Sequence, residues 1–188
     1  VDFIRRGEPA ESLYYLVEGS VTALLEDDDR HELTLAYINK GEFIGEMGLF
    51  QDQTTRSVIV RTREPCKVAE VSYVRVQQLL ERELREHALG LMFAIGGQLA
   101  QRLRQTSRQV GDLAFLDVTG RIAGALLQLC KQPDAMTHPD GMQIRITRQD
   151  LGRMVGCSRE MAGRVLKALE EKGHISVSGK TIVVFGTR

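Results

Sequence analysis

Residues 147–173 constrain the fold more than any other part of the chain, because they predict two short helices joined by a tight turn. Thr147, followed three residues later by Asp150, is a helix start signal, and Ser158 can cap a second helix in the same way. Gly156 lies between the two predicted helices, where the chain must turn. Two helices joined in this way are typical of a helix-turn-helix.

The second predicted helix turns charged side chains outward near its N-terminal half. Val165 and Leu169 lie one turn apart and can pack on the first helix, which leaves the charged residues on the opposite side. A solvated helix face is the simpler interpretation of such charges. In a helix-turn-helix, however, this half enters the major groove, where arginine pairs with guanine and glutamate with cytosine. We therefore expect base recognition by this face, which carries Arg159, Glu160, Arg164 and Lys167.

The net charge of the chain is zero, but the charge is divided unevenly along it. Residues 1–113 contain 14 Lys and Arg against 18 Asp and Glu, whereas residues 114–188 contain 11 against 7. A basic C-terminal part attracts a phosphate backbone, and the acidic remainder indicates a different task. With 188 residues and 43% hydrophobic content, the chain is long enough to form two small domains.

Residues 1–73 alternate short strand-like runs with glycine. The runs are "LYYLVEG", "SVTALLE", "ELTLAYINKG", "SVIVRT" and "CKVAEVSY". Short β runs at this spacing predict a small antiparallel barrel or roll, and the acidic segment "EDDDRHE" predicts the exposed tip of a hairpin.

Residues 74–110 favour a helix with a long apolar stripe. The stripe suits packing along the barrel or a parallel dimer seam, and it contains Leu91, Ile95, Leu99, Leu103, Thr106 and Val110. Gly111 predicts a break in the helix, with a hinge over residues 111–116.

Residues 117–188 extend the helix-turn-helix into a winged domain. "DVTGRIAGALLQLCKQ" predicts a helix, "PDAMTHPDGMQ" a surface loop, and "ISVSGKTIVVFG" two strands about a Ser178–Gly179 turn. The expected fold is therefore α+β: a β-roll over residues 1–73, a long helix over 74–110, the hinge, and a winged helix-turn-helix over 117–188.

The segments "GEFIGEMGLF" and "TTRS" form a second candidate site. Glycines are common at barrel corners, so they are weak evidence alone. Gly45 nevertheless lets a backbone approach a ligand closely, Glu46 can accept from a ribose hydroxyl, and Arg56 can hold an anionic oxygen beside Ser57. Together these residues predict a pocket for a phosphorylated sugar.

Other site classes lack support in the sequence. Cys66, Cys130 and Cys157 are too scattered for a disulfide framework, and no CxxC pair or clustered His predicts a metal site. No apolar run is long enough to span a bilayer, so we expect a cytoplasmic protein. The chain opens at Val1 without Met, which leads us to expect further residues before it.

Six segments together resemble the bacterial cyclic AMP receptor protein family of transcription regulators. They are "GEMGLF", "TTRS", "LAFLDVTGRI", "KQPDAMTHPDGMQIRITRQ", "VGCSRE" and "GKTIVVFGTR", and the similarity extends over essentially the whole chain. The resemblance implies a cyclic-nucleotide-binding β-roll, a long dimerisation helix, and a winged helix-turn-helix that binds a two-fold symmetric DNA site.

The resemblance also implies residue roles. Gly45 and Glu46 match backbone and ribose contacts, Arg56 and Ser57 match cyclic phosphate contacts, and Thr106 with Ser107 of the partner subunit matches adenine contacts. In the C-terminal part, Arg159, Glu160 and Arg164 match residues that read bases, and Thr147, Arg148 and Ser158 match residues that contact phosphates. The loop Ala135–Gln143 matches the segment that contacts the α subunit of RNA polymerase.

Two departures from the family pattern suggest fewer contacts to the DNA backbone. Met161 stands where threonine is common, and Ser178 occupies the wing tip where a basic or imidazole side chain is often found. Relatives that respond to cyclic di-GMP usually replace the serine after the barrel arginine with an acid, whereas Ser57 is kept here.

We therefore expect a homodimeric regulator gated by cyclic AMP, with a response to cyclic di-GMP, or activity without ligand, as the alternatives. Two further classes stay open. One is a nucleotide-sensing module that contacts proteins, and the other is a phosphodiesterase, which has no metal cluster or paired carboxylates to support it.

Overall fold

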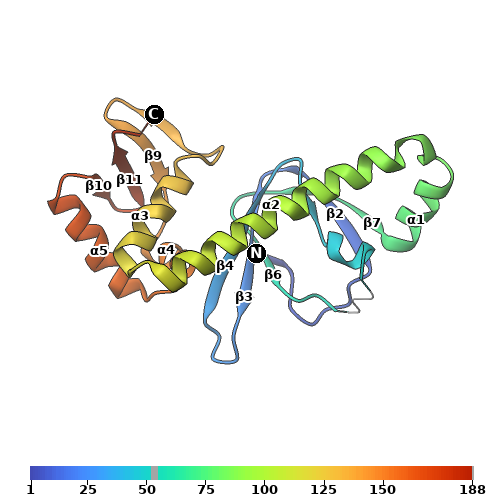
Figure 1. The fold of residues 1–188 in the computed structure, drawn as a ribbon, viewed down its shortest axis with the longest axis horizontal. Helices are drawn as coiled ribbons and strands as arrows, with labels where there is room; N and C mark the ends of the chain where they lie inside the picture. Colours follow the sequence, from blue (N-terminus) through green and yellow to red (C-terminus); the bar gives the residue numbers. More distant parts are fainter. Residues whose placement is uncertain (52–54, 188) are drawn as a thin grey trace. The chain divides into compact units, whose positions relative to one another are not determined.

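The chain divides into two compact units, Val1–Ser107 and Arg108–Arg188, which are described separately. The structure is a computed structural model that describes residues 1–51 and 55–187 (Figure 1). Thr54, the first residue of the "TTRS" segment, and Arg188 lie outside the described residues.

The N-terminal unit contains a β-roll of two antiparallel sheets (Figure 1). One sheet has the order β1-β6-β3-β4 and the other the order β5-β2-β7. The strands are β1 (Asp2–Ile4), β2 (Ser12–Glu18), β3 (Ser20–Glu26), β4 (Glu32–Asn39), β5 (Phe43–Ile44), β6 (Ile59–Thr62) and β7 (Lys67–Ser72). The five predicted runs all form strands, and the acidic segment joins β3 to β4 as a hairpin.

The core of the roll comes from side chains that point inward at alternate positions of the strands. These side chains leave water together, which is the main free-energy gain of such a small sheet structure. The buried cluster contains Ile4, Leu16, Val21, Ala23, Ile38, Ile44 and Val60.

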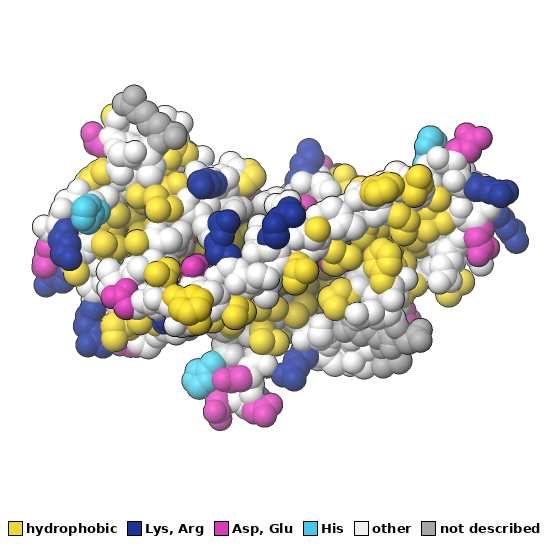
Figure 2. Space-filling view, viewed as in Figure 1, with side chains coloured by type: hydrophobic (Ala, Val, Ile, Leu, Met, Phe, Trp, Pro, Cys, Tyr) yellow, Lys and Arg dark blue, Asp and Glu magenta, His cyan; other side chains and the backbone are white. Residues whose placement is uncertain are grey.

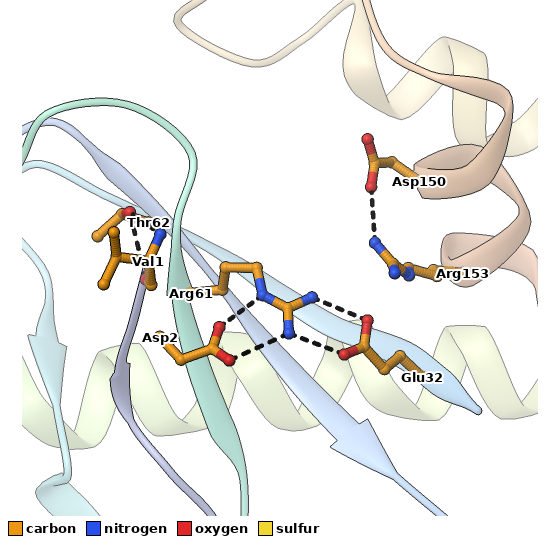
Figure 3. Close-up of polar contacts among 7 residues, drawn as sticks. All are labelled: Val1, Asp2, Glu32, Arg61, Thr62, Asp150 and Arg153. Carbon is orange, nitrogen blue, oxygen red and sulfur yellow. Dashed lines mark hydrogen bonds and ion pairs between the residues drawn. The ribbon is translucent and has the colours of Figure 1, made fainter. Parts of the chain in front are cut away.

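An ion network ties three strands of the first sheet together on its outer side (Figure 3). Arg61 on β6 contacts Asp2 on β1 at 2.5 Å and Glu32 on β4 at 2.8 Å. The hydrogen bond from Arg61 lowers the pKa of the Asp2 carboxyl below its ordinary value, against the opposing effect of burial.

Two helices follow the roll where one was expected. α1 (Tyr73–Glu81) ends before a short 3₁₀ turn, η2 (Arg85–His87), and α2 (Ala88–Phe115) begins directly after it. α2 also continues through Gly111 to Phe115, so the expected helix break at Gly111 is wrong. A single glycine costs an α-helix only about 1 kcal/mol, which neighbouring helical residues offset. The hinge over residues 111–116 stays a prediction.

The apolar stripe on α2 separates into two faces. Ile95 is fully buried against the roll, whereas Leu103 is 69% exposed and Phe93 is 72% exposed. Hydrophobic side chains recur along the face of α2 seen in Figure 2. The exposed positions follow a spacing of four and three residues: Leu89, Phe93, Gly96, Ala100, Leu103, Ser107 and Val110. The expected stripe therefore combined core residues with residues of a heptad-like outer face.

The C-terminal unit is a small winged domain. Its helices are α3 (Val118–Leu129), α4 (Arg148–Val155) and α5 (Arg159–Glu171), and its strands are β8 (Met136–His138), β9 (Gly141–Arg145), β10 (Ile175–Ser178) and β11 (Thr181–Phe185). The sheet has the order β10-β11-β9-β8, and its buried side chains meet those of the three helices. The segment expected to be a loop in fact contains β8 and the start of β9, because Met136 to His138 pair with Gly141 to Gln143.

Candidate functional site

A cavity of about 320 Å³ lies within the N-terminal unit, between the roll and α2. Five of the six residues predicted to bind a nucleotide line it: Gly45, Glu46, Arg56, Ser57 and Thr106. Ser107 is not among the lining residues and lies exposed on α2. The turn after β5, the segment before β6 and helix α2 thus bring together residues up to 61 positions apart in the sequence.

The turn at Gly45 is shaped around Arg56. Gly45 has φ 83°, a left-handed conformation that favours glycine, and it precedes the 3₁₀ turn η1 (Glu46–Leu49). A Cβ atom at Gly45 would overlap Nη1 of Arg56 and lie 2.9 Å from the carbonyl oxygen of Ser12. The sequence predicted that this glycine admits a ligand; the structure shows that it also admits the arginine.

Arg56 is a buried cation, with 8% of its surface exposed. Its Nη2 donates to the Ser12 carbonyl at 2.7 Å and its Nη1 to the Tyr73 hydroxyl at 3.1 Å. The guanidinium also lies 5.5 Å from the ring centroid of Tyr14. These bonds engage two of the five donors of the group, and no carboxylate among the described residues pairs with it. The remaining donors are available to an anion in the cavity.

Glu46 is also buried, at 4% exposure, but it has a charged partner. Arg102 on α2 contacts the Glu46 carboxylate at 2.5 Å and donates to the Phe43 carbonyl at 2.8 Å. One turn earlier on α2, Gln98 donates to the same carbonyl at 2.8 Å and accepts from the Phe43 amide at 2.7 Å. α2 therefore holds β5 and the start of the turn in place.

Sequence reasoning missed Arg102, Gln98 and Tyr73. Arg102 falls one turn before Thr106, so its position on the same helix face was the available signal. The hydroxyl of Tyr73 donates to the Gly45 carbonyl at 2.5 Å, a contact that no local pattern indicated because 28 residues separate the two.

In the C-terminal unit, both predicted caps of the helix-turn-helix form. Thr147 Oγ1 accepts from the Asp150 amide at 3.0 Å and Ser158 Oγ accepts from the Met161 amide at 3.2 Å. Gly156 takes a left-handed conformation with φ 65°. The turn is tight, since a Cβ at Gly152 would lie 2.6 Å from the Cys157 carbonyl oxygen.

The structure places the predicted base readers on one exposed face of α5. Ala162, Val165, Leu166 and Leu169 form the buried face. Arg159, Glu160 and Arg164 are exposed, and within residues 1–51 and 55–187 they form no ion pair. Lys167 is exposed and lies 3.8 Å from Glu171, a surface pair of little energetic weight. Arg148 is exposed at the start of α4, where its side chain lies beside Gly163 of α5.

Arg121 on α3 holds the end of α4 and was not predicted. It donates to the Val155 carbonyl at 3.0 Å and to the Leu116 carbonyl at 3.1 Å. These bonds satisfy carbonyls left unpaired near helix ends and fix the segment that precedes the turn.

The acidic hairpin tip carries the one potential metal cluster in the described part of the chain. Ligand atoms of Asp27, Asp29 and His31 lie within 4.8 Å of one another, and all three residues are exposed. Figure 2 shows this tip as a group of acidic side chains beside a histidine. In the same described residues, no helix is long and apolar enough to cross a membrane.

Two family patterns match the chain: the cyclic nucleotide-binding domain over residues 3–83 and the Crp-like helix-turn-helix domain over residues 120–185. The cAMP-activated global transcriptional regulator Vfr of Pseudomonas aeruginosa is 56% identical over 188 residues, covering 98% of this chain and 86% of Vfr. The chain belongs to the Crp family of transcription regulators.

Two further similarities agree with this assignment. The cAMP-activated global transcriptional regulator CRP of Salmonella typhimurium is 55% identical to this Crp-family regulator over 185 residues, covering 98% of this chain and 86% of CRP. A solved structure of the cyclic di-GMP-responsive global regulator CLP of Xanthomonas campestris is 53% identical, with a TM-score of 0.95, over 100% of this chain and 90% of CLP. The expected fold class and the expectation of a DNA-binding regulator that is not an enzyme are confirmed.

Proposed function

We propose that the cavity binds cyclic AMP and that this binding controls DNA recognition by the helix-turn-helix. The observation that carries the proposal is the state of the two buried charges. Arg56 has no anionic partner among the described residues and retains free donors, whereas Glu46 is neutralised by Arg102. These three side chains leave the cavity with one uncompensated positive charge. That charge matches the single negative charge of one cyclic phosphate.

The same charge pattern favours cyclic AMP over cyclic di-GMP. Cyclic di-GMP carries two phosphodiesters, and the second would enter a cavity whose other cation is already paired with Glu46. The named activator of two relatives at 55 and 56% identity is cAMP. Cyclic di-GMP is the second candidate, because the regulator with a TM-score of 0.95 responds to it.

The residues of the pocket take separate roles in this proposal. Arg56 and Ser57 bind the cyclic phosphate, the Gly45 backbone approaches it, and Glu46 accepts from the ribose hydroxyl while keeping Arg102 beside it. Thr106, with Ser107 of the partner subunit, contacts the adenine. The exposed heptad-like face of α2 supports a parallel homodimer, which such a shared base contact requires.

In the C-terminal unit, Arg159, Glu160 and Arg164 read base edges of a two-fold symmetric operator. The support for this role is that all three are exposed, without ion-pair partners among the described residues, on the side of α5 opposite its buried residues. Arg148, Thr147 and Ser158 contact phosphates. The Thr147 hydroxyl already donates to Asp150 at 2.6 Å, so its phosphate contact exchanges that bond.

Two expectations from the family resemblance complete the proposal. The β8–β9 hairpin, which includes the predicted Ala135–Gln143 segment, contacts the α subunit of RNA polymerase; its exposed Met136 supports a contact role. Residues 111–116 act as the hinge between the nucleotide-binding and DNA-binding parts of a cytoplasmic regulator.

Calorimetric titration with cyclic AMP, cyclic GMP and cyclic di-GMP in parallel tests the ligand, and a mobility shift with a symmetric operator tests its effect. We expect the tightest binding for cyclic AMP and a complex with DNA that strengthens when cyclic AMP is added. Tighter binding of cyclic di-GMP would assign the second candidate. DNA binding of equal strength with and without every nucleotide would show a regulator that is active without ligand.

A further inference from the structure

The hydroxyl of Tyr73 joins two parts of the pocket, the turn at Gly45 and the guanidinium of Arg56. Tyr73 is the first residue of α1, directly after the capping residue Ser72. Its hydroxyl donates to the carbonyl oxygen of Gly45 at 2.5 Å and accepts from Nη1 of Arg56 at 3.1 Å. One oxygen atom therefore fixes both the glycine turn and the arginine.

The second glycine of the turn is explained by the Tyr73 ring. A Cβ atom at Gly48 would lie 2.5 Å from Cζ and from the hydroxyl oxygen of Tyr73. Gly48 does not have a positive φ, so its backbone conformation is open to other residues. The space occupied by the tyrosine, and not the backbone, requires glycine at this position.

We propose that Tyr73 is a positioning residue that holds Arg56 ready for the cyclic phosphate; this inference rests on the proposed function. An arginine side chain loses considerable rotamer freedom when it is fixed, and a ligand that must fix it binds more weakly. The Tyr73 and Ser12 bonds restrict the guanidinium of Arg56, which lines the cavity, before the ligand arrives. Tyr73 thus raises affinity without touching the anion.

Tyr73→Phe tests this role, because it removes the hydroxyl and keeps the ring against Gly48. Hydrogen bonds to charged groups are among the stronger ones in proteins, so we expect cyclic AMP affinity to fall about tenfold. Tyr15→Phe is the matched control. Tyr15 lies on β2 of the roll, and its hydroxyl forms no hydrogen bond within the described residues, so its removal leaves affinity unchanged.

A double-variant cycle separates positioning from a general structural role. Arg56→Lys should itself bind cyclic AMP more weakly, because lysine lacks the planar guanidinium. In that background, Tyr73→Phe should change the affinity less than twofold, because the guanidinium that Tyr73 positions is gone. Gly48→Ala, which displaces the ring, should reproduce the loss in the wild type and have no effect in a Tyr73→Ala background.

The outcomes distinguish this inference from the proposed function. If the wild type binds neither cyclic AMP nor cyclic di-GMP, the proposed function is wrong and the role of Tyr73 falls with it. If the wild type binds but Tyr73→Phe binds equally well, only the positioning role is overturned. The positioning role is also overturned if Tyr73→Phe still costs tenfold in affinity in the Arg56→Lys background, since Tyr73 then acts independently of the arginine.

Discussion

The charged residues of the pocket and those of α5 are arranged in opposite ways. In the pocket, Glu46 and Arg56 are almost fully buried, and each is held by named donors or acceptors. On α5, Arg159 and Arg164 are exposed and form no ion pair within the described part of the chain. A buried charge needs hydrogen-bond partners before a ligand arrives, because leaving its polar atoms unsatisfied is costly, whereas exposed charges are hydrated until DNA replaces the water.

This difference predicts two kinds of consequence for substitutions. A change in the pocket alters both stability and ligand binding, because neighbouring groups lose their partners. A change on α5 alters DNA recognition alone.

Arg56→Leu is expected to weaken cyclic AMP binding about 1,000-fold, or about 4 kcal/mol, because it removes the one cavity cation that has no carboxylate partner among the described residues. Calorimetric titration measures the loss. Circular dichroism and the oligomeric state should stay unchanged, since the core cluster of the roll does not include this residue. Undiminished binding would contradict the phosphate site.

Arg102→Met is expected to lower the free energy of unfolding by about 3 kcal/mol, because it leaves the buried Glu46 carboxylate without its partner. The exposed pair between Lys167 and Glu171 provides the control, and Lys167→Met should cost less than about 0.5 kcal/mol. Urea denaturation compares the two. Equal losses would show that burial does not distinguish the pocket from α5.

The success of sequence reasoning differed between these two regions for a physical reason. On α5, caps, apolar spacing and exposed charges are local, so the sequence predicted the helix-turn-helix and its outer face correctly. In the pocket, Gly45 and Arg56 stand 11 residues apart and were found together, but Tyr73 and Arg102 reach the turn from distant helices. No local pattern indicates the Tyr73 contact, and the only signal for Arg102 was its place one turn before Thr106 on the same helix.

The two fold errors have different origins. A single glycine costs an α-helix only about 1 kcal/mol, which the helical residues around it offset, and α2 continues through Gly111 to Phe115. The segment "PDAMTHPDGMQ" has loop composition, yet Met136 to His138 gain strand geometry from pairing with β9, which already belongs to the sheet of β11.

Arg164→Ala is expected to remove about 1 to 3 kcal/mol of discrimination at one symmetric pair of base positions, because an arginine fork reads guanine. Arg148→Ala should instead weaken all operators alike and reduce the salt dependence of binding, since it contacts phosphate. Mobility shifts with operators substituted one base pair at a time, at two salt concentrations, separate the effects. An equal loss on every operator for Arg164→Ala would place this arginine on the DNA backbone.

The smallest effect concerns the ion network of Asp2, Arg61 and Glu32 on the outer side of the roll (Figure 3). The Arg61 hydrogen bond lowers the pKa of Asp2 in the folded protein, so its carboxylate stabilises the fold above the unfolded pKa of about 3.9. That contribution is lost as the pH falls through the folded pKa, when both states become protonated. Asp2→Asn should therefore reduce the free energy of unfolding by about 0.5 to 1 kcal/mol at pH 7.

The decisive measurement is the pH dependence of that reduction. The difference between the wild type and Asp2→Asn should shrink steadily below about pH 4, because protonation removes from the wild type the charge that the variant already lacks. Asp28→Asn is the control on the exposed hairpin, and its unfolding curve should follow the wild type at every pH. A difference for Asp2→Asn that stays constant down to pH 2 would mean that the side chain acts through shape or neutral hydrogen bonds. The charge of Asp2 would then contribute nothing to stability, in contrast to the charge of Glu46 in the buried ion pair of the pocket.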